Sequence, residues 1–563
     1  MERPGETLSR SAFRSSYRAD EGSVIAAIID HARVDATDGP QVKALASELI
    51  SLIRDAQGNG TWDFRQILQD YDLSTDEGLA LMCLAEALIR VPDSATADHL
   101  IADKLSGGDW LAHASADRPL FVNAAAWGLT LGQHVVADPV DPDRWRRGHQ
   151  KLFSRLGARA VRTALNQVMQ AMGRVFVFAE TIDDAIKKVR GHGQPFEQYS
   201  FDMLGEAACT PDQAEHYFQQ YRQAIEQLKH AVSPRIKPSI SVKLSALHPT
   251  YLPLKRERIM AQLYPRLLHL CRGAMAAGLD LCLDAEETER LELSLDLLEA
   301  LLDEPSLQDW DGLGLAVQAY QKHAYPLLRW LVERTARAGR RLRVRLVKGA
   351  YWDNEIKACQ LAGLKDFPVF TRKVSTDISY LACARLLLEQ RDRLYPCFAS
   401  HNAQTLASVM VMAGAPPRGF EIQRLHGMGE IAHQHICRTQ HVVSRIYAPI
   451  GAQRQLLPYL VRRLLENGAN SSFVSQVVAP DTTVEQLTRD PVAVFRALDH
   501  VSNPTIARPP DLYKPHRQNS EGLDFSDRQQ LGVLHTQLTK ARAQLFPMAA
   551  GPMLAGPKAT GSG

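Results

Sequence analysis

The feature that most constrains the fold is a series of short β-rich runs after residue 195, separated by amphipathic segments of helical length. The runs occupy residues 199–204, 239–245, 279–286, 313–320, 343–348, 396–402, 420–427 and 442–451. No hairpin signal joins neighbouring runs, so consecutive strands are expected to pair in parallel through crossover helices. Eight such units are the number that closes a (βα)8 barrel, and the predicted fold class is therefore α/β with a TIM-like barrel.

Polar side chains end nearly every run. They are Asp202, Lys243, Asp284, Gln318, Lys348 with Tyr351, His401 with Asn402, His426, and Tyr447. Because the carboxyl ends of barrel strands share one mouth, where substrates bind, these side chains are expected to gather there. A doubly wound Rossmann sheet is the rival fold, but the chain has no GxGxxG between a strand and a helix.

Composition excludes several classes of function. A net charge of +2 gives no electrostatic footprint for nucleic acid or for an anionic membrane. The eight cysteines lack CxxC spacing, which indicates reduced, buried thiols in a cytoplasmic protein. There is no signal peptide and no long apolar run, so any membrane contact is expected to be peripheral. No metal-binding spacing of histidine, cysteine or carboxylate residues occurs, so no metal is expected.

Arg462 and Arg463 are adjacent in a predicted helix at 457–474. The residues around them in this helix are mostly apolar. Neighbouring helical positions diverge by about 100°, so at least one of the two guanidiniums is expected to face a buried partner. Arginine suits a partly desolvated carboxylate or phosphate, because its planar fork binds such groups bidentately. The alternative is a solvated helix face on which Arg462 pairs with Glu466.

At the expected mouth, Arg462, Arg463 and Lys243 could neutralise an anionic ligand while Asp284 pairs with a cationic centre. Such an arrangement suits a zwitterionic amino acid. Three alternatives stay open at this point. Lys243 and Asp284 could form a plain salt bridge. Lys243 or Lys348 could serve as the Schiff-base nucleophile of a flavin-free aldolase or lyase. The barrel could also be the scaffold of a binding module whose helical N-terminal half contacts a partner.

Eight ordered motifs carry a family resemblance. They are SVKLSALHP at 241–249, LDAEE at 283–287, VQAYQK at 317–322, RLVKGAYWDNEIK at 345–357, SHN at 400–402, RLHGMGE at 424–430, RIYAPIG at 445–451 and YLVRRLLENGANSSFV at 459–474. Together they resemble the proline dehydrogenase domain of the bifunctional proline utilization A flavoenzymes, from about residue 20 to about residue 550.

The resemblance implies roles for individual residues. L-Proline would be bound by Lys243, Asp284, Tyr351, Leu425, Tyr447, Arg462 and Arg463. FAD would be contacted by Gln318, Arg345, Val347, Lys348, Gly349, Trp352, Thr371, His401, Asn402, Glu466 and Ser472. The implied reaction removes a hydride from proline to flavin N5, gives Δ1-pyrroline-5-carboxylate, and passes the electrons to a membrane quinone.

The resemblance also implies an organisation. Residues 1–50 would form an arm that supports a homodimer, 51–175 a helical domain, 176–480 the barrel, and 481–563 a C-terminal helix and linker or tail. The chain looks like a form without the N-terminal ribbon-helix-helix DNA-binding module, so nucleic acid is not expected as a partner. It also stops about where the family's aldehyde dehydrogenase domain should begin.

Overall fold

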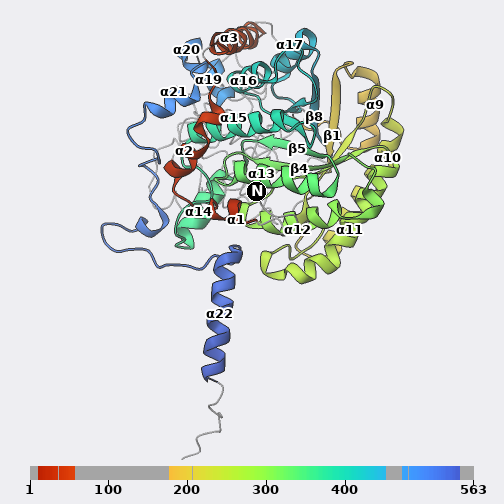
Figure 1. Ribbon diagram of the computed structural model, residues 1–563. Coiled ribbons are helices and arrows are strands. Elements are labelled where there is room, and N and C mark those ends of the chain that lie inside the picture. The colour runs from red at the N-terminus through yellow and green to blue at the C-terminus, as the bar shows by residue number, and fades with distance from the viewer. Residues whose placement is uncertain are drawn as a thin grey trace, which may run out of the picture.

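The predicted barrel is present. The computed structural model describes residues 10–35, 37–56, 176–203, 205, 207–451, 472–479 and 481–545. Within them, eight parallel strands form a closed barrel in sequence order, β1 to β8, and β8 pairs with β1 to close it. The α/β fold class with a TIM-like barrel is thereby confirmed (Figure 1).

The strands begin close to the predicted positions and mostly end earlier than predicted. They are β1 (Glu197–Asp202), β2 (Ser239–Val242), β3 (Asp280–Leu283), β4 (Leu313–Gln318), β5 (Leu342–Val347), β6 (Leu394–Ala399), β7 (Glu421–Leu425) and β8 (Val443–Pro449). The residues that follow each strand are loop, and they form the mouth. These polar loop residues were included in the predicted runs because strand-like composition continues past the last pairing.

Helices surround the barrel. Those between strands are α10 (Pro211–Leu228), α11 (Arg256–Ala276), α12 (Leu291–Leu302), α13 (Ala324–Ala338), α14 (Trp352–Leu361), α15 (Lys373–Glu389), α16 (Ala403–Ala413) and α17 (Glu430–Gln440). Those outside it are α1 (Ser11–Ser15), α2 (Glu21–Ala32), α3 (Gly39–Asp55), α9 (Ile182–His192), α19 (Phe473–Val478), α20 (Val484–Leu487), α21 (Pro491–Arg496) and α22 (Arg528–Leu545).

Two faces of each strand have opposite character. Outward-facing residues such as Ile240, Leu281 and Val344 are fully buried under the helices and form the main apolar core. The barrel interior is polar instead. Its chain of hydrogen bonds runs from Arg345 Nε to Gln423 Oε1 at 2.9 Å, and from Gln423 Nε2 to Glu421 Oε1 at 2.7 Å. The interior therefore holds a fixed column of hydrogen-bonded side chains beneath the mouth.

The N-terminal segment packs on the barrel. α2 buries Ile25 and Ile28 against Ile378 and Leu381 of α15. α3 lies near α16 and α17, and α22 projects away from the body (Figure 1). Helical periodicity in the sequence predicts helices at 42–53, 79–89, 150–172 and 526–545. The first corresponds to α3 and the last to α22. The other two lie outside the described residues.

Two further expectations concern the described part of the chain. Six of its seven free cysteines are buried, but Cys209 is exposed, so the expectation of buried thiols is wrong at that position. Among the described helices, none is both long enough and apolar enough to cross a bilayer.

Candidate functional site

A cavity of about 760 Å³ opens at the C-terminal mouth of the barrel. Every described residue to which the family resemblance assigned a contact with L-proline or FAD lines it. These residues are Lys243, Asp284, Gln318, Arg345, Val347, Lys348, Gly349, Tyr351, Trp352, Thr371, His401, Asn402, Leu425, Tyr447 and Ser472. Arg462, Arg463 and Glu466 lie outside the described residues. Because the carboxyl ends of the strands share one mouth, residues more than 200 positions apart in the sequence lie in one site.

The cavity floor is a charge-balanced cluster. Lys243 Nζ donates to Asp202 Oδ2 at 2.8 Å and lies 3.5 Å from Asp284 Oδ2. Tyr447 Oη is 2.7 Å from an oxygen of each of these carboxylates. Arg345 Nη1 donates to Asp284 Oδ1 at 2.6 Å. Two cations therefore face two carboxylates, and the Lys243–Asp284 salt bridge left open above is the longer of two that Lys243 makes.

The protonation states of the floor follow from these contacts. Burial by itself would lower the pKa of Lys243, but Asp202, Tyr447 and Asp284 raise it well above its ordinary value. Burial, and then the two carboxylates, raise the pKa of Tyr447 well above its ordinary value. At neutral pH the lysine is therefore charged and the phenol is neutral.

All three guanidinium nitrogens of Arg345 donate hydrogen bonds. Besides Asp284 and Gln423, it donates through Nη2 to Ser200 Oγ and Ser241 Oγ, both at 3.0 Å. Its guanidinium also lies 5.2 Å from the ring centre of Tyr447. The side chain therefore belongs to the top layer of the barrel interior, and it supports the floor.

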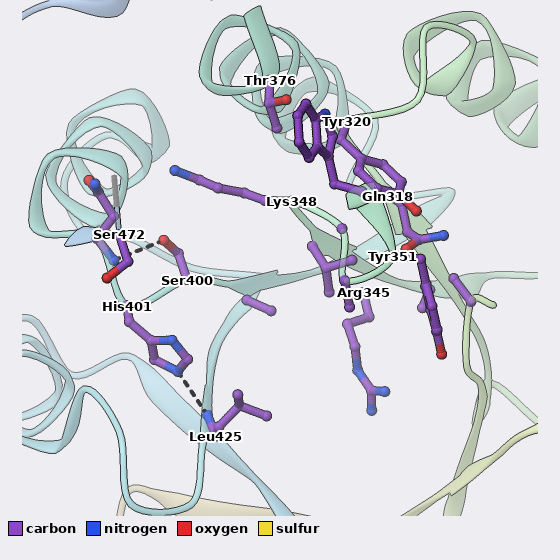
Figure 2. Close-up of a pocket in the computed structure, with 18 of the residues that line it drawn as sticks. Gln318, Tyr320, Arg345, Lys348, Tyr351, Thr376, Ser400, His401, Leu425 and Ser472 are labelled. Carbon is purple, nitrogen blue, oxygen red and sulfur yellow. Dashed lines mark hydrogen bonds between the residues drawn. The ribbon is translucent and has the colours of Figure 1, made fainter. Parts of the chain in front are cut away.

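The walls come from loops after β5, β6 and β7. His401 Nε2 accepts the Leu425 N–H at 3.0 Å, as Figure 2 shows, so the proton of the neutral ring is on Nδ1. Trp352 Nε1 donates to the Phe370 carbonyl at 2.8 Å. Gly349 has φ +134°, and a Cβ there would lie 2.5 Å from the Tyr320 ring. Only glycine fits this place, because the Tyr320 ring occupies the space that a side chain would need.

The start of α15 forms another wall, which the sequence reasoning missed. Arg372, Lys373 and Thr376 line the cavity there, and the N-cap residue Arg372 makes no side-chain capping bond. Burial, and the nearby Lys348, lower the pKa of Lys373, although Asp377 opposes them. The positive end of the helix dipole and a basic side chain make this helix start suitable for an anion. The run TRKVST at 371–376 is the signal that could have found it.

His426 was expected at the mouth but is not among the lining residues. Its ring packs edge-on against Phe178 with 5.1 Å between centroids. Burial, with help from Arg424 and Lys188, lowers the pKa of His426 to about 4. It turns away because the loop after β7 bends there, with its own N–H bonded to the Tyr447 carbonyl.

The fold and the site together define a (βα)8-barrel domain with a binding site at its C-terminal mouth. Comparison with known families specifies the class further. A profile named Proline dehydrogenase matches residues 184–476, and one named Proline utilization A proline dehydrogenase N-terminal domain matches residues 7–54. The chain belongs to the proline dehydrogenase family, as the sequence motifs predicted.

Individual relatives agree. Bifunctional protein PutA of Escherichia coli is 42% identical over 576 residues, covering 99% of this chain and 43% of that protein. The same-named protein of Rhizobium meliloti is 42% identical and covers 96% of this chain and 44% of its own length. A crystal structure of a Bradyrhizobium japonicum Proline Utilization A mutant matches 93% of this chain and 53% of that one, with TM-score 0.72 and 43% identity. The chain thus spans less than half the length of these curated relatives.

One comparison runs against an expectation. A profile named DNA-binding domain of Proline dehydrogenase matches residues 63–176. The expectation of no nucleic-acid partner rested on the net charge of +2 and on the missing ribbon-helix-helix module, and it treated 51–175 only as a helical domain. That expectation is withdrawn. Nearly all of the matched stretch lies outside the described residues.

Proposed function

We propose that this chain oxidises L-proline to Δ1-pyrroline-5-carboxylate at the barrel mouth, with FAD as its cofactor. The observation that carries the proposal is one cavity that combines a charge-balanced floor with a basic helix start. The floor suits a small zwitterion, and the N-terminus of α15 suits the phosphates of a dinucleotide. The name of the matching family, Proline dehydrogenase, and that of the related crystal structure, Proline Utilization A, support proline as the substrate.

The described residues fit FAD. The cavity is far larger than a single amino acid requires, and the uncapped start of α15 supplies an anion site. Gly349 and Tyr320 both line the cavity and pack closely against each other. We propose that the cofactor is held by this wall and by the predicted contacts, which are Gln318, Arg345, Val347, Lys348, Gly349, Trp352, Thr371, His401, Asn402, Glu466 and Ser472. Bound there, FAD would supply the acceptor for the hydride.

The substrate carboxylate needs positive charge that the floor does not supply. The charges of Lys243 and Arg345 are already matched by Asp202 and Asp284. The proposal therefore assigns the carboxylate to the predicted pair Arg462 and Arg463, with Lys243 contributing beneath. Tyr351, Leu425 and Tyr447 would enclose the proline ring and exclude water. The Tyr447 hydroxyl lies 2.7 Å from an oxygen of Asp202 and 2.7 Å from an oxygen of Asp284, and sharing its single proton between them fixes the position of its ring.

The floor residues are poor acceptors for the substrate's amine proton. Lys243 and Tyr447 are already protonated, and both carboxylates accept hydrogen bonds from them. Their role is therefore to orient the substrate. We expect the proline amine to lose its proton to solvent or to a group above the floor, with hydride transfer following from correct orientation.

The same contacts disfavour the aldolase alternative. A Schiff-base lysine must be neutral, whereas Lys243 is paired with Asp202, and Lys348 Nζ lies 2.5 Å from Asp377 Oδ1. Borohydride trapping with a carbonyl substrate would detect a Schiff base. We expect no trapped adduct.

Three partner proposals go with the reaction. A quinone would accept the electrons, which quinone-dependent reoxidation of the proline-reduced protein would test. A homodimer through the arm would appear as twice the chain mass in light scattering. For nucleic acid, a mobility-shift assay with duplex DNA would decide whether the profile name over residues 63–176 applies to this chain.

The deciding experiment is the visible spectrum of the purified protein before and after anaerobic addition of L-proline. We expect a flavin spectrum that bleaches on proline. A flavin spectrum that proline leaves unchanged would overturn the substrate. A colourless protein that FAD cannot reconstitute would overturn the cofactor.

A further inference from the structure

The N-terminal arm reaches the cavity wall through one buried carboxylate. Glu21 is the first residue of α2 and is 2% exposed. Its Oε2 accepts both the N–H of Thr371 at 3.0 Å and the hydroxyl of Thr371 at 2.7 Å. Thr371 lines the cavity and lies 350 positions further along the chain.

The same threonine also receives a bond from the C-terminal side. Its Oγ1 accepts the N–H of Asn503 at 2.8 Å, and Asn503 lines the cavity too. Arg372 Nε donates to the Val501 carbonyl at 3.1 Å. Three segments that are distant in sequence therefore meet at the residues just before α15, and Glu21 is the anion at their centre.

The position of these residues decides where the start of α15 points. Thr371 and Arg372 are the last two residues before the first turn of the helix, which is the anion site of the cavity. Removing the carboxylate would free the Thr371 hydroxyl to rotate and would leave its N–H buried without this acceptor. The apolar contact between α2 and α15 would remain, because Ile25 and Ile28 form it.

Glu21 itself is incompletely satisfied. Among the described residues, no hydrogen-bond donor reaches its Oε1. A buried oxygen without a donor calls for an explanation beyond packing, and a functional role is one such explanation. We infer that Glu21 is a positioning residue that holds Thr371 and the start of α15 in place for the phosphates of the cofactor. The inference rests on the proposed function, because it presupposes FAD.

The test compares FAD release from the purified holoenzymes of seven proteins. They are the wild type, Glu21→Ala, Glu21→Gln, Thr371→Val, the double variant Glu21→Ala/Thr371→Val, Asp20→Asn and Arg385→Ala. Release is followed as the recovery of FAD fluorescence after dilution. Asp20 caps α2 on the exposed side, and Arg385 binds the far end of that helix through the His31 and Arg33 carbonyls. Both controls loosen the arm without touching the cavity.

Glu21→Ala and Thr371→Val are each expected to release FAD about tenfold faster, since each loses buried hydrogen bonds. The double variant should release FAD less than about a hundredfold faster, the product of two independent effects, because the two substitutions share the bond between the Thr371 hydroxyl and Glu21. In Glu21→Ala, whose substituted side chain is not among the proposed cofactor contacts, the rate of turnover per bound flavin should not change. The controls should match the wild type in FAD release even where their melting temperatures fall.

Glu21→Gln keeps an oxygen that can accept both bonds, so it should restore slow release. Release from Glu21→Ala as slow as from Arg385→Ala would overturn the inference, and so would Glu21→Gln behaving like Glu21→Ala. A wild-type protein that cannot hold FAD is a separate result. It would overturn the proposed function, and the inference with it, before any variant is compared.

Discussion

At the scale of single residues, the site is defined by which charges are already paired. Lys243 is one side chain whose sequence position alone suggested three roles: ligand for a carboxylate, nucleophile, or salt-bridge partner. Its contacts with Asp202 and Tyr447 show that the floor depends on it. A charge that is both buried and paired is difficult to remove without unbalancing its partner.

Lys243→Met is expected to lower the free energy of unfolding by about 3 kcal/mol, because it leaves Asp202 buried with no cation beside it. It should also abolish proline oxidation. Urea unfolding and steady-state assays measure the two effects. The matched control is Lys237→Met at the opposite end of the barrel.

Lys237 pairs with Asp280 at 2.7 Å, but its side chain is 54% exposed. Its removal is expected to cost less than about 1 kcal/mol, as for most exposed ion pairs. Equal losses in the free energy of unfolding would show that Lys243 contributes no more to stability than Lys237 does.

At the scale of elements, short segments at the strand ends shape the cavity. The turn after β5 approaches Tyr320 so closely that only glycine fits at 349. Similarly, α17 is tied to the barrel by His433, whose ring nitrogens lie 2.9 Å from Ser444 Oγ and 2.9 Å from the Ser400 carbonyl. Each element is fixed by one feature that a local sequence pattern does not reveal.

Gly349→Ala is expected to cost at least about 2 kcal/mol, from the positive φ and from the collision with the Tyr320 ring. FAD binding should weaken as well. Gly339→Ala is the control, because Gly339 has φ +66° and its Cβ would meet nothing within 4 Å. It should cost about 1 kcal/mol and leave FAD binding unchanged. Equal effects on FAD binding would show that the approach at 349 is unimportant.

Stability is expected to fall as the pH drops from about 6.5 toward 4, in part through His433. Burial, with a smaller contribution from Arg424, lowers its pKa to about 3, so the folded protein binds this proton less readily than the unfolded chain. Between the two pKa values the unfolded state gains protons, and each such group costs about 1.4 kcal/mol per pH unit.

His433→Gln, which cannot be charged, should flatten this slope in urea unfolding measured from pH 7 to pH 5. The exposed His500 provides the control variant, His500→Gln, which should leave the slope unchanged. If the slope of stability against pH in His433→Gln is as steep as in the wild type, the assignment to His433 is contradicted.

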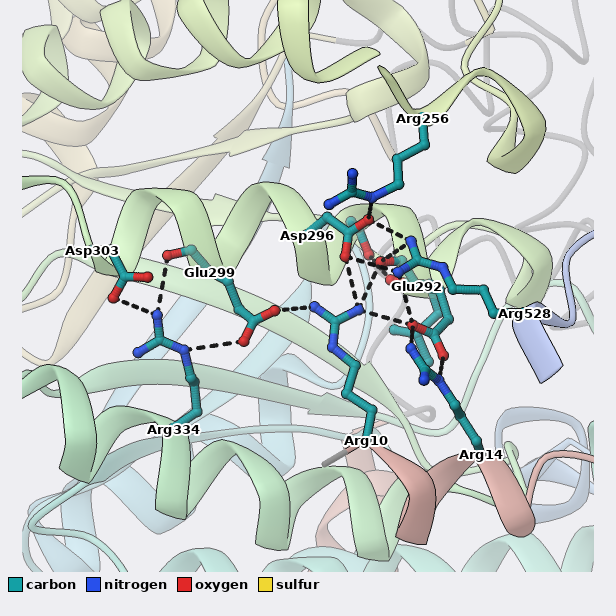
Figure 3. A network of polar contacts seen from close by, with 11 residues as sticks. Arg10, Arg14, Arg256, Glu292, Asp296, Glu299, Asp303, Arg334 and Arg528 are labelled. Carbon is teal, nitrogen blue, oxygen red and sulfur yellow. Dashed lines mark hydrogen bonds and ion pairs between the residues drawn. The ribbon is translucent and has the colours of Figure 1, made fainter. Parts of the chain in front are cut away.

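At the scale of the whole molecule, both described ends of the chain are fastened to the same helix. Figure 3 shows Arg10 and Arg14 of the arm and Arg528 at the start of α22 gathered on the acidic face of α12. Asp296 is the common partner of Arg10, Arg256 and Arg528. Asp296 thus acts as a clamp that holds both described ends of the chain on α12.

Asp296→Ala is expected to lower the free energy of unfolding by about 3 kcal/mol, chiefly because it removes a partner of the buried Arg10. Both ends should also become more sensitive to limited proteolysis. The control is Asp303→Ala, whose side chain is 67% exposed and pairs only with Arg334 among the described residues. Unchanged proteolysis at both ends would contradict the clamp.

Much of the fold could be predicted from the sequence because its signals are local. Strand composition, helix-length spacers and the missing hairpin turns are each visible within a few residues, and they predicted eight parallel strands and a common mouth. The same rule correctly gathered Lys243, Asp284 and Gln318 into one cavity. It was wrong for His426, because the direction of a loop side chain depends on what packs beside it.

The sequence by itself therefore determined the barrel, the order of its strands and the family. Only the tertiary structure decided which polar side chains form hydrogen bonds with each other: Lys243 with Asp202, Arg345 with Ser200, and Glu21 with Thr371. The physical reason is that periodicity is a property of neighbouring residues, whereas these pairs form only when barrel closure brings distant segments together. Electrostatic balance is a property of that closed arrangement, and it fixes what the site can bind.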